Sequence, residues 1–195
     1  MPPLILASTS RYRAELLGRL RIPFDVRAPH VDETALPDET PPALARRLAL
    51  AKANAVAAPL GEGLVIGSDQ VAHCRGRVLG KPGGFAAAQE QLRHMRGSTT
   101  EFITAVALVN ARTGAAQVEL VPTRVTLRDL GDAEIDAYLR ADEPYDCAGS
   151  ARSEGLGVAL IEHMTGDDPT ALVGLPLIAL CRMLRAEGVD LLAAR

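Results

Sequence analysis

The segment Leu4–Leu17 reads LILASTSRYRAELL and joins a short apolar run, three hydroxyl residues and the start of a leucine repeat. The run Leu4–Ala7 is predicted to form a buried strand, because it is short, apolar and bounded by polar residues. Leucines then recur at helical spacing, which predicts a helix over Arg11–Leu20. Ser10 lies at the expected N-cap, where a hydroxyl accepts a hydrogen bond from a helix amide that has no other partner.

Strand-like and helix-like segments alternate along the rest of the chain. Helical periodicity predicts helices over Ala43–Ala57, Phe85–Met95, Asp132–Arg140 and Leu175–Glu187. Apolar or β-branched runs predict strands over Phe24–Arg27, Gly63–Ala72, Thr99–Val109, Gln117–Thr126 and Gly157–Glu162. Loops are expected over Pro29–Pro42, Gly76–Gly84 and Glu143–Leu156. Strands that alternate with helices, together with one hairpin, predict an α/β fold with a mixed sheet.

The composition bounds the size of the fold and argues against nucleic acid polymers as partners. The chain of 195 residues is long enough for one large core, or for one core divided into two lobes by a cleft. A net charge of −3 provides no broad basic surface for DNA or RNA. An aromatic content of 3%, without Trp, offers few side chains on which bases stack. We therefore expect no nucleic acid polymer as a partner.

Cysteine spacing and hydropathy bound the class further. The three cysteines are far apart and odd in number, which favours reduced thiols over a disulfide framework or a zinc site. The four histidines show no metal-ligand spacing. No run approaches the roughly 18 apolar residues of a membrane span, and the first residues lack the basic flank of a signal peptide. A cytoplasmic location without a membrane partner is expected.

The turn Ser8-Thr9-Ser10 leads into the predicted helix that carries Arg13. Free amides at a helix start, hydroxyl donors and the helix dipole together bind anions. Arg13 adds a donor for charge-assisted bonds to phosphate. From these residues alone, a capped helix with solvated arginines is an equally good interpretation. The segment is not a Walker loop, because its glycines and lysine are absent.

Two acidic residues are candidates for a metal site. Asp69 is expected at the end of a buried strand, where α/β sheets form ligand clefts, and it can hold a divalent ion or orient a water. Glu33, in the polar loop Val31–Thr34, is a candidate second carboxylate. The alternatives are a carboxylate in an ordinary turn and a solvated loop acid. Carboxylate oxygens suit magnesium or manganese.

The turn Gly80-Lys81-Pro82-Gly83 supplies a candidate cation. A rigid turn can direct a lysine ammonium at a phosphate, although the same tripeptide also occurs in turns without a ligand. Together the four segments provide carboxylates for a metal, cations for a polyphosphate and a helix start for one phosphate.

These segments, in this order, resemble the Maf family of nucleotide pyrophosphatases over essentially the whole chain. Each motif alone is weak, whereas the ordered set is specific. The matching motifs are Ala7-Ser8-x-Ser10-x-x-Arg13-x-Glu15-Leu16-Leu17, Val31-Asp32-Glu33, Gly67-Ser68-Asp69-Gln70, Gly80-Lys81-Pro82, Cys147-Ala148-Gly149-Ser150, Ser153-Glu154-Gly155, Thr165-Gly166-Asp167-Asp168-Pro169 and Val173-Gly174-Leu175-Pro176-Leu177.

The resemblance implies a single domain over residues 1–195, with a bent mixed sheet flanked by helices, inosine-triphosphatase-like, and two lobes around a nucleotide cleft. It implies hydrolysis of a nucleoside triphosphate between the α- and β-phosphates, with a divalent cation (magnesium, manganese or cobalt) as cofactor, and a homodimer. Asp69 falls at the position of the family's catalytic carboxylate, with Glu33 and Lys81 at its acid and its lysine. Asp69 and Glu33 are the implied metal ligands, and Ser8, Ser10 and Arg13 correspond to the phosphate loop.

Three positions resemble the YceF-like branch of the family, which is associated with 7-methyl-GTP rather than dTTP and UTP. Tyr12 stands where much of the family has arginine, Gln70 where many relatives have threonine, and Glu154 completes the set. An aromatic face attracts the cationic 7-methylguanine ring, and a carboxylate accepts from its N1 and N2 donors. Alternatives left open are a packing tyrosine with a loop-capping Glu154, and activity on dTTP, UTP or another modified nucleotide. A regulator of cell division that binds nucleotide without turnover is a further alternative.

Overall fold

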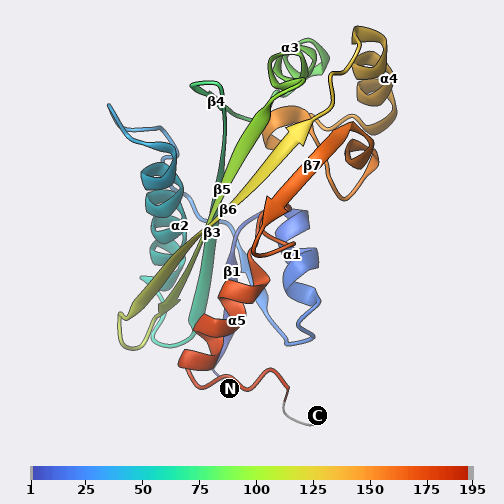
Figure 1. Cartoon of the computed structure of the whole chain (residues 1–195). Helices are drawn as coiled ribbons and strands as arrows, with labels where there is room; N and C mark the ends of the chain where they lie inside the picture. Colours follow the sequence, from blue (N-terminus) through green and yellow to red (C-terminus); the bar gives the residue numbers. More distant parts are fainter. Residues whose placement is uncertain (1, 193–195) are drawn as a thin grey trace. The chain divides into compact units, whose positions relative to one another are not determined.

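The computed structural model describes residues 2–192 and has the predicted α/β class (Figure 1). Its helices and strands follow one another as β1 (Leu4–Ala7), α1 (Arg11–Gly18), β2 (Asp25–Arg27), α2 (Pro41–Ala57), β3 (Leu64–Cys74), β4 (Arg77–Leu79), α3 (Phe85–Met95), β5 (Thr99–Asn110), β6 (Ala116–Leu127), α4 (Asp132–Asp142), β7 (Ile161–Gly166) and α5 (Leu177–Ala186). Two short 3₁₀ turns, Ala148–Ser150 and Leu156–Leu160, lie between α4 and β7.

The sheet is mixed, as predicted. Its strand order is β2-β1-β3-β5-β6-β7, and β4 pairs with β3 off this path. β1 is parallel to both β2 and β3, whereas β4 is antiparallel to β3 and β7 is antiparallel to β6. The parallel strands β1 and β3 are apolar throughout their first residues and fully buried there, as expected for strands covered on both faces.

The chain forms two compact units. The first comprises residues up to 69, 104–121 and from 168 onward, and the second comprises 70–103 and 122–167. In the first unit, apolar side chains of β1, α1, β3, β5 and α5 form one buried cluster that includes Leu6, Ile66 and Leu180. In the second unit, Leu92, Ile135 and Leu139 are fully buried. The expectation of a single domain with two lobes stays a prediction.

The first strand and helix are close to their predicted bounds. β1 is Leu4–Ala7 as expected, and α1 begins at Arg11 but ends at Gly18. The Ser10 side chain caps α1 by accepting a hydrogen bond from the Arg13 amide, with 3.4 Å between the two heavy atoms. α2 begins at Pro41, inside the expected loop, because proline is well tolerated in the first turn of a helix.

The prediction that β3 ends near Asp69 is wrong. β3 continues to Cys74, and Ala72 pairs with Leu79 of β4, a strand inside the expected turn segment Gly76–Gly84. The polar residues at 68–70 look like a strand end in the sequence, but Ser68 and Asp69 are both buried and hydrogen-bonded. Asp69 therefore lies in the middle of a strand rather than at its end.

The predicted strand Gly157–Glu162 is also wrong over most of its length. Residues Leu156–Leu160 form a 3₁₀ turn, and β7 begins only at Ile161. A side chain at Gly157 would approach the Arg152 carbonyl oxygen to 2.6 Å, so the chain is folded tightly back on itself there. Short apolar runs of this kind do not distinguish a strand from a turn by periodicity.

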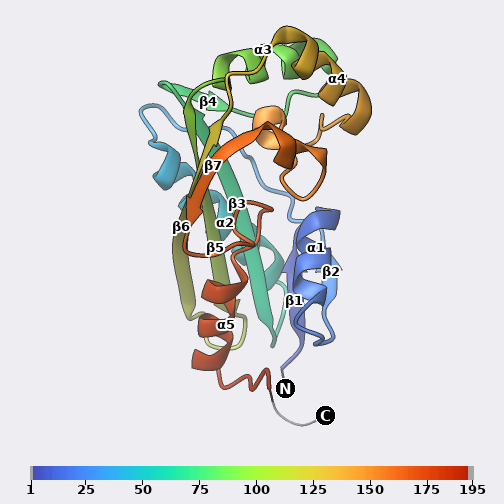
Figure 2. The same ribbon diagram turned by 45° about the vertical axis from the view of Figure 1, so that its right-hand side comes forward.

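Helix α2 packs closely against β3 (Figures 1 and 2). A Cβ atom added at Gly67 would lie 2.1 Å from the Ala49 carbonyl oxygen and 2.8 Å from the Ala53 amide. Ala49 and Ala53 are themselves fully buried. The missing side chain of Gly67 and the two alanines therefore allow the backbone of the helix to approach the strand.

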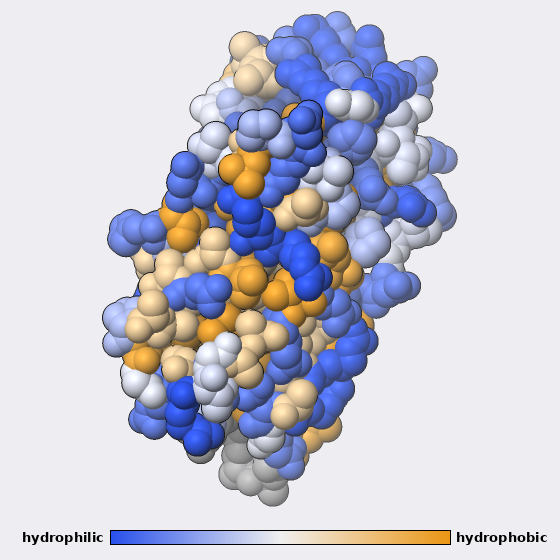
Figure 3. Space-filling model, turned by 90° about the vertical axis from the view of Figure 1, so that its left-hand side faces the viewer, coloured by the Kyte–Doolittle hydropathy of each residue, from blue (hydrophilic) through white to orange (hydrophobic). Residues whose placement is uncertain are grey.

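The surface carries both polar and apolar residues, as the space-filling view of one face shows (Figure 3). Large apolar side chains that remain exposed include Val26, Leu36 and Val158. Exposed apolar atoms make up much of any folded surface, so these residues alone indicate no partner. Within residues 2–192, no helix has the length and apolar character needed to cross a membrane.

Candidate active site

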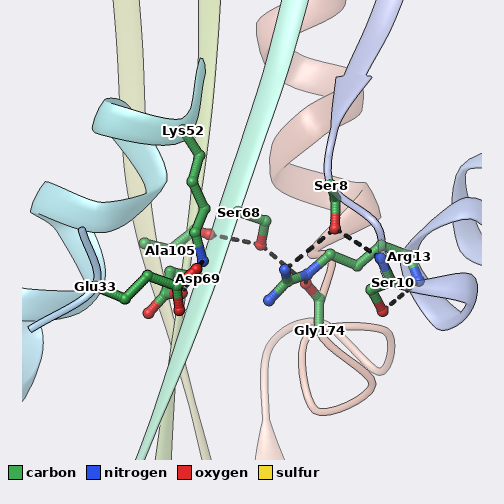
Figure 4. Close-up of polar contacts among 9 residues, drawn as sticks. All are labelled: Ser8, Ser10, Arg13, Glu33, Lys52, Ser68, Asp69, Ala105 and Gly174. Atoms are coloured by element: carbon green, nitrogen blue, oxygen red, sulfur yellow. Dashed lines mark hydrogen bonds and ion pairs between the residues drawn. The ribbon is translucent and has the colours of Figure 1, made fainter. Parts of the chain in front are cut away.

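Asp69, Glu33 and Lys52 form a cluster of three charged side chains in the first unit (Figure 4). The Lys52 Nζ atom lies 2.7 Å from Asp69 Oδ1 and 2.8 Å from Glu33 Oε1. Lys52 and Asp69 are 5% and 7% exposed, whereas the Glu33 side chain is 58% exposed. The structure thus brings together the two predicted carboxylates, with a lysine between them that sequence reasoning did not identify.

Lys52 reaches Asp69 because α2 packs so closely on β3. On α2 the buried positions recur at helical spacing, and Lys52 falls among them, one residue before Ala53. A charged residue on an otherwise apolar helix face is the signal that identifies such a lysine in a sequence. A buried ammonium requires a charged partner, and Asp69 provides it.

Burial raises the pKa of the Asp69 carboxyl above its usual value, against the lowering by Lys52 and, to a smaller extent, by Arg13. The Glu33 carboxylate adds a further, smaller increase. The cluster holds two carboxylates and one ammonium, so its net charge is negative when all three groups are ionised. A perturbed carboxyl beside an ion pair is typical of catalytic sites, although structural ion pairs also produce it.

The loop that carries Glu33 is tied back to α2 by Arg47. Arg47 donates to both Glu39 carboxylate oxygens, over 2.6 and 2.7 Å, and to the Thr34 carbonyl oxygen over 3.0 Å. The bonds from Arg47 and, to a smaller extent, one from the Leu36 amide lower the pKa of the Glu39 carboxyl to about 2, so the pair stays ionised under ordinary conditions. A bidentate arginine–carboxylate pair fixes geometry as well as charge, and here it fixes the loop next to Glu33.

Ser8, in the turn after β1, and Arg13, in the first turn of α1, lie on the other side of β3 (Figure 4). Ser8 is 4% exposed, and its hydroxyl oxygen accepts from the Ser10 amide at 3.1 Å and from Arg13 Nη1 at 3.4 Å. The Ser8 hydroxyl proton and the amides of the first turn of α1 are donors of the kind that binds anions. The predicted phosphate loop therefore has a folded counterpart in the structure.

Arg13 is held by neutral groups rather than by a carboxylate. Its Nε donates to the Gly174 carbonyl oxygen over 2.8 Å, and within residues 2–192 no ion pair involves Arg13. Burial lowers the pKa of the Arg13 guanidinium, while the nearby carboxylates of Asp69 and Glu33 raise it. A guanidinium has five N–H donors and stays charged in proteins, so Arg13 retains donors for an anion.

Ser68, on β3, contacts the same Gly174 carbonyl oxygen that accepts from Arg13. Its hydroxyl lies 2.8 Å from the Gly174 carbonyl oxygen and 2.8 Å from that of Ala105, and it donates its one proton to either. Successive residues of a strand point to opposite faces, so Ser68 faces Gly174 while Asp69 faces Lys52. Neither Ser68 nor Gly174 was a predicted site residue, because both contacts depend on segments distant in the sequence.

Three further predicted residues, Lys81, Gln70 and Glu154, belong to the second unit. Lys81 is exposed in a turn that is fixed by two bonds, from the Gln91 side chain to the Gly80 carbonyl and from the Gly83 amide to the Tyr145 carbonyl. Glu154 is also exposed, and Gln70 is the first residue of this unit. The approach of all three to the first-unit residues stays a prediction.

Tyr12 already contacts a cation. The Arg11 guanidinium carbon lies 4.7 Å from the centre of the Tyr12 ring, and Arg11 Nη2 donates to the Tyr12 hydroxyl over 2.7 Å. A stacked arginine is a common partner of an aromatic face. A cationic base that uses Tyr12 must therefore take the other face of the ring or displace Arg11.

The donor set for a metal is small. Within residues 2–192, no group of three or more His, Cys, Asp or Glu side chains is arranged to hold an ion. Asp69 and Glu33 are two carboxylates on one cluster, one buried and one open to solvent. Magnesium is usually held by one or two carboxylates together with substrate phosphates and waters. The two carboxylates of Asp69 and Glu33 match this coordination.

The chain is similar to one family of known proteins and to several relatives that share one name. Residues 3–187 match the family described as Maf-like protein. The 7-methyl-GTP pyrophosphatase of Albidiferax ferrireducens is 60% identical, with 98% of this chain and 96% of that protein aligned. Proteins of the same name from Burkholderia pseudomallei and Cupriavidus pinatubonensis are 62% and 57% identical, over 99% and 100% of this chain and 91% and 98% of their own.

Solved structures give a weaker similarity. A nucleoside-triphosphatase / dITP/XTP pyrophosphatase from Mycobacterium abscessus aligns over 95% of both chains, with 14% sequence identity and a TM-score of 0.43. A similarity this low supports no inference about fold or substrate.

Proposed function

Because this chain belongs to the Maf family, we propose that it hydrolyses 7-methyl-GTP between the α- and β-phosphates, giving 7-methyl-GMP and pyrophosphate. The name shared by relatives of about 60% identity supports this substrate. The observation that carries the proposal is that two charged regions contact adjacent residues of β3, one at Ser68 and one at Asp69. Ser68 leads to Arg13 through Gly174, and Asp69 leads to Lys52 and Glu33.

The Arg13 region binds the phosphates in this proposal. Ser8, Ser10 and the first amides of α1 donate to one phosphate, and Arg13 adds charge-assisted bonds. Lys81, from the second unit, contributes a further positive charge to the triphosphate. Positive donors at the departing pyrophosphate lower the barrier, because negative charge accumulates there as the bond breaks.

Asp69 is the proposed base and Lys52 the residue that positions it. In its ionised form Asp69 accepts a proton from a water that attacks the α-phosphorus, and its raised pKa makes it a better base than an ordinary aspartate. Lys52 holds Oδ1, which leaves Oδ2 for the water or for a ligand. Asp69 and Glu33 are the residues that would hold a divalent cation, which neutralises phosphate charge when bound.

The proposed base contacts come from Tyr12, Gln70 and Glu154. Tyr12 offers an aromatic face to the cationic 7-methylguanine, a contact worth roughly 0.5–2 kcal/mol. Glu154 accepts from the guanine N1 and N2 donors, and Gln70 supplies an amide to the substrate. A homodimer and a cytoplasmic location remain predictions from the resemblance and the composition.

A panel of nucleotides tests the function. Purified protein with magnesium, manganese or cobalt is expected to release pyrophosphate from 7-methyl-GTP faster than from GTP, dTTP or UTP, and a chelator is expected to abolish the release. Faster turnover of dTTP or UTP would reassign the substrate. Tight nucleotide binding without any pyrophosphate release, with every metal, would instead favour a regulatory protein.

A further inference from the structure

A main-chain carbonyl group accepts the shorter of the two hydrogen bonds that hold the Arg13 guanidinium, the other being to the Ser8 hydroxyl oxygen. Arg13 Nε donates to the Gly174 carbonyl oxygen over 2.8 Å, and Ser68 lies within hydrogen-bond distance of the same oxygen. Gly174 has φ +116°, a conformation that residues with a side chain rarely adopt. The direction of this carbonyl, and hence of the arginine, depends on how the loop 168–176 is folded.

Asp168 and Thr170 stabilise that loop through hydrogen bonds within it and to the start of α5. Asp168 is 3% exposed, and its Oδ1 accepts from the Thr170 amide at 2.9 Å and lies 2.6 Å from the Thr170 hydroxyl. Its Oδ2 accepts from the Ile178 amide, in the first turn of α5, at 2.7 Å. A buried carboxylate that receives amide and hydroxyl donors is a rigid support, because each lost bond leaves a charged oxygen unsatisfied.

The Thr170 hydroxyl closes the other end of the loop. It accepts from the Leu177 amide at 2.8 Å, and the Leu175 carbonyl oxygen lies 2.9 Å away as an alternative acceptor for its proton. Gly174 itself donates to the Ala171 carbonyl over 2.9 Å, and that oxygen also accepts from the buried Thr104 hydroxyl of β5 at 2.9 Å. The residues on both sides of Gly174 are therefore fixed to the helix and to the sheet.

We propose that Asp168 and Thr170 are positioning residues for phosphate binding, which act by aiming the Gly174 carbonyl at Arg13. This rests on the proposed function only in that the anion is taken to be the triphosphate of the substrate. Neither residue needs to touch the substrate. Their loss lets the carbonyl turn away, the guanidinium then leaves its orientation, and the phosphates lose a preorganised partner.

Thr170→Val and Thr170→Ser separate this role from general support of the fold. Thr170→Val removes the hydroxyl at nearly constant shape and is expected to raise KM for 7-methyl-GTP about tenfold, with kcat changed less, since a hydrogen bond to a charged group is worth about that factor. Thr170→Ser keeps the hydroxyl and is expected to retain the KM of the unaltered protein. In an Arg13→Ala background, Thr170→Val is expected to change kcat/KM no further.

The control variant is Glu187→Gln. Glu187 lies at the other end of α5 and accepts from the side chains of Asn110 and Gln117, so it also ties this helix to its neighbours. It is expected to leave KM unchanged. If Thr170→Val lowers kcat/KM by the same factor with and without Arg13, the effect is structural and the proposal is wrong.

A second measurement does not depend on activity. The Arg13 Nε–H signal, assigned by its loss in Arg13→Lys, is expected to exchange slowly with solvent in the ¹⁵N spectrum of the unaltered protein. Exchange is expected to accelerate in Thr170→Val and in Asp168→Asn, which keeps one acceptor oxygen, but not in Thr170→Ser or Glu187→Gln. Unchanged exchange in folded Thr170→Val and Asp168→Asn contradicts the proposal. Accelerated exchange in a protein that releases no pyrophosphate contradicts only the proposed function.

Discussion

Two regions of the first unit hold their charged groups in opposite ways. On the Asp69 side, which comprises Asp69, Lys52 and Glu33, charged groups bind one another at 2.7 and 2.8 Å. On the Arg13 side, which comprises Ser8, Ser10, Arg13 and Gly174, a single guanidinium is held by a carbonyl and a hydroxyl oxygen. In the first region the lysine is paired with two carboxylates, whereas the guanidinium of the second forms no ion pair within residues 2–192.

The difference indicates a division of work. A region with net negative charge and a carboxyl of raised pKa suits proton transfer and a divalent cation. A region whose guanidinium forms no ion pair with any described carboxylate suits a phosphate. Changes on the Asp69 side are therefore expected to act on turnover, and changes on the Arg13 side on substrate binding.

Asp69→Asn gives the largest expected effect. The amide cannot take a proton from water, so kcat for pyrophosphate release from 7-methyl-GTP is expected to fall by roughly two orders of magnitude or more, with KM changed little. In the unaltered protein the acid limb of the pH–rate profile is expected to lie above the usual aspartate range, because the pKa of Asp69 is raised.

The matched control is Asp190→Asn, which removes a carboxylate that caps the Leu192 amide in the same unit. It is expected to leave kcat unchanged. A folded Asp69→Asn protein with full turnover would remove Asp69 from the chemistry and end the proposed division of work.

Lys52→Met tests how strongly the Asp69 side depends on its internal pairing. Removal of one partner leaves a buried carboxylate uncompensated, which is expected to lower the free energy of unfolding by about 3–5 kcal/mol when Asp69 is ionised. With the folded-state pKa of Asp69 raised above its unfolded value, this loss appears as pH rises through the folded pKa and shrinks at lower pH. Urea unfolding at pH 5 and pH 8 measures it.

Two variants accompany Lys52→Met. Lys52→Arg keeps the charge, and Lys52→Met combined with Asp69→Asn removes both charges. The free energy of unfolding of each of these two variants is therefore expected to depend less on pH than that of Lys52→Met alone. An unfolding free energy of Lys52→Met that falls equally at both pH values means that the pair contributes packing rather than charge.

The sequence predicts the Arg13 side better than the Asp69 side. The strand Leu4–Ala7 and the cap at Ser10 are local features, set by neighbouring residues, and both are confirmed. The mixed α/β sheet follows from the order of the segments and is confirmed as well. Local hydrogen bonding and periodicity carry such predictions, because they need no knowledge of what packs against the segment.

The Asp69 side depends on tertiary contacts that no local pattern contains. Lys52 pairs with Asp69 only because Gly67 and the alanines of α2 allow the helix to approach β3. The interpretation of Asp69 as a strand end is wrong because Ser68 and Asp69 are polar yet buried, each satisfied by a partner from another segment. The Gly174 anchor of Arg13 was missed for the same reason. The catalytic and binding roles of all these residues stay predictions.

Arg13→Ala examines the Arg13 side directly and is expected to have a smaller effect on turnover than Asp69→Asn. Loss of the guanidinium removes charge-assisted bonds to phosphate, so KM for 7-methyl-GTP is expected to rise roughly tenfold or more while kcat falls less. Arg13→Lys keeps the charge but not the fork geometry, and it is expected to recover only part of the loss. Steady-state kinetics of the three proteins measure both constants. A fall in kcat with unchanged KM would contradict the division of work.

Arg11 and Tyr12 give the smallest expected effect, on selectivity alone. The Arg11 guanidinium lies 4.7 Å from the centre of the Tyr12 ring, so it competes with a cationic base for that face or weakens the attraction of the opposite one. Arg11→Ala is therefore expected to raise the ratio of kcat/KM for 7-methyl-GTP over GTP a few-fold, and Tyr12→Leu to lower it. Both nucleotides carry the same triphosphate, so any contact between Arg11 and phosphate cancels in this ratio. If neither variant changes the ratio, Tyr12 does not read the base, and the Arg13 side binds phosphate only.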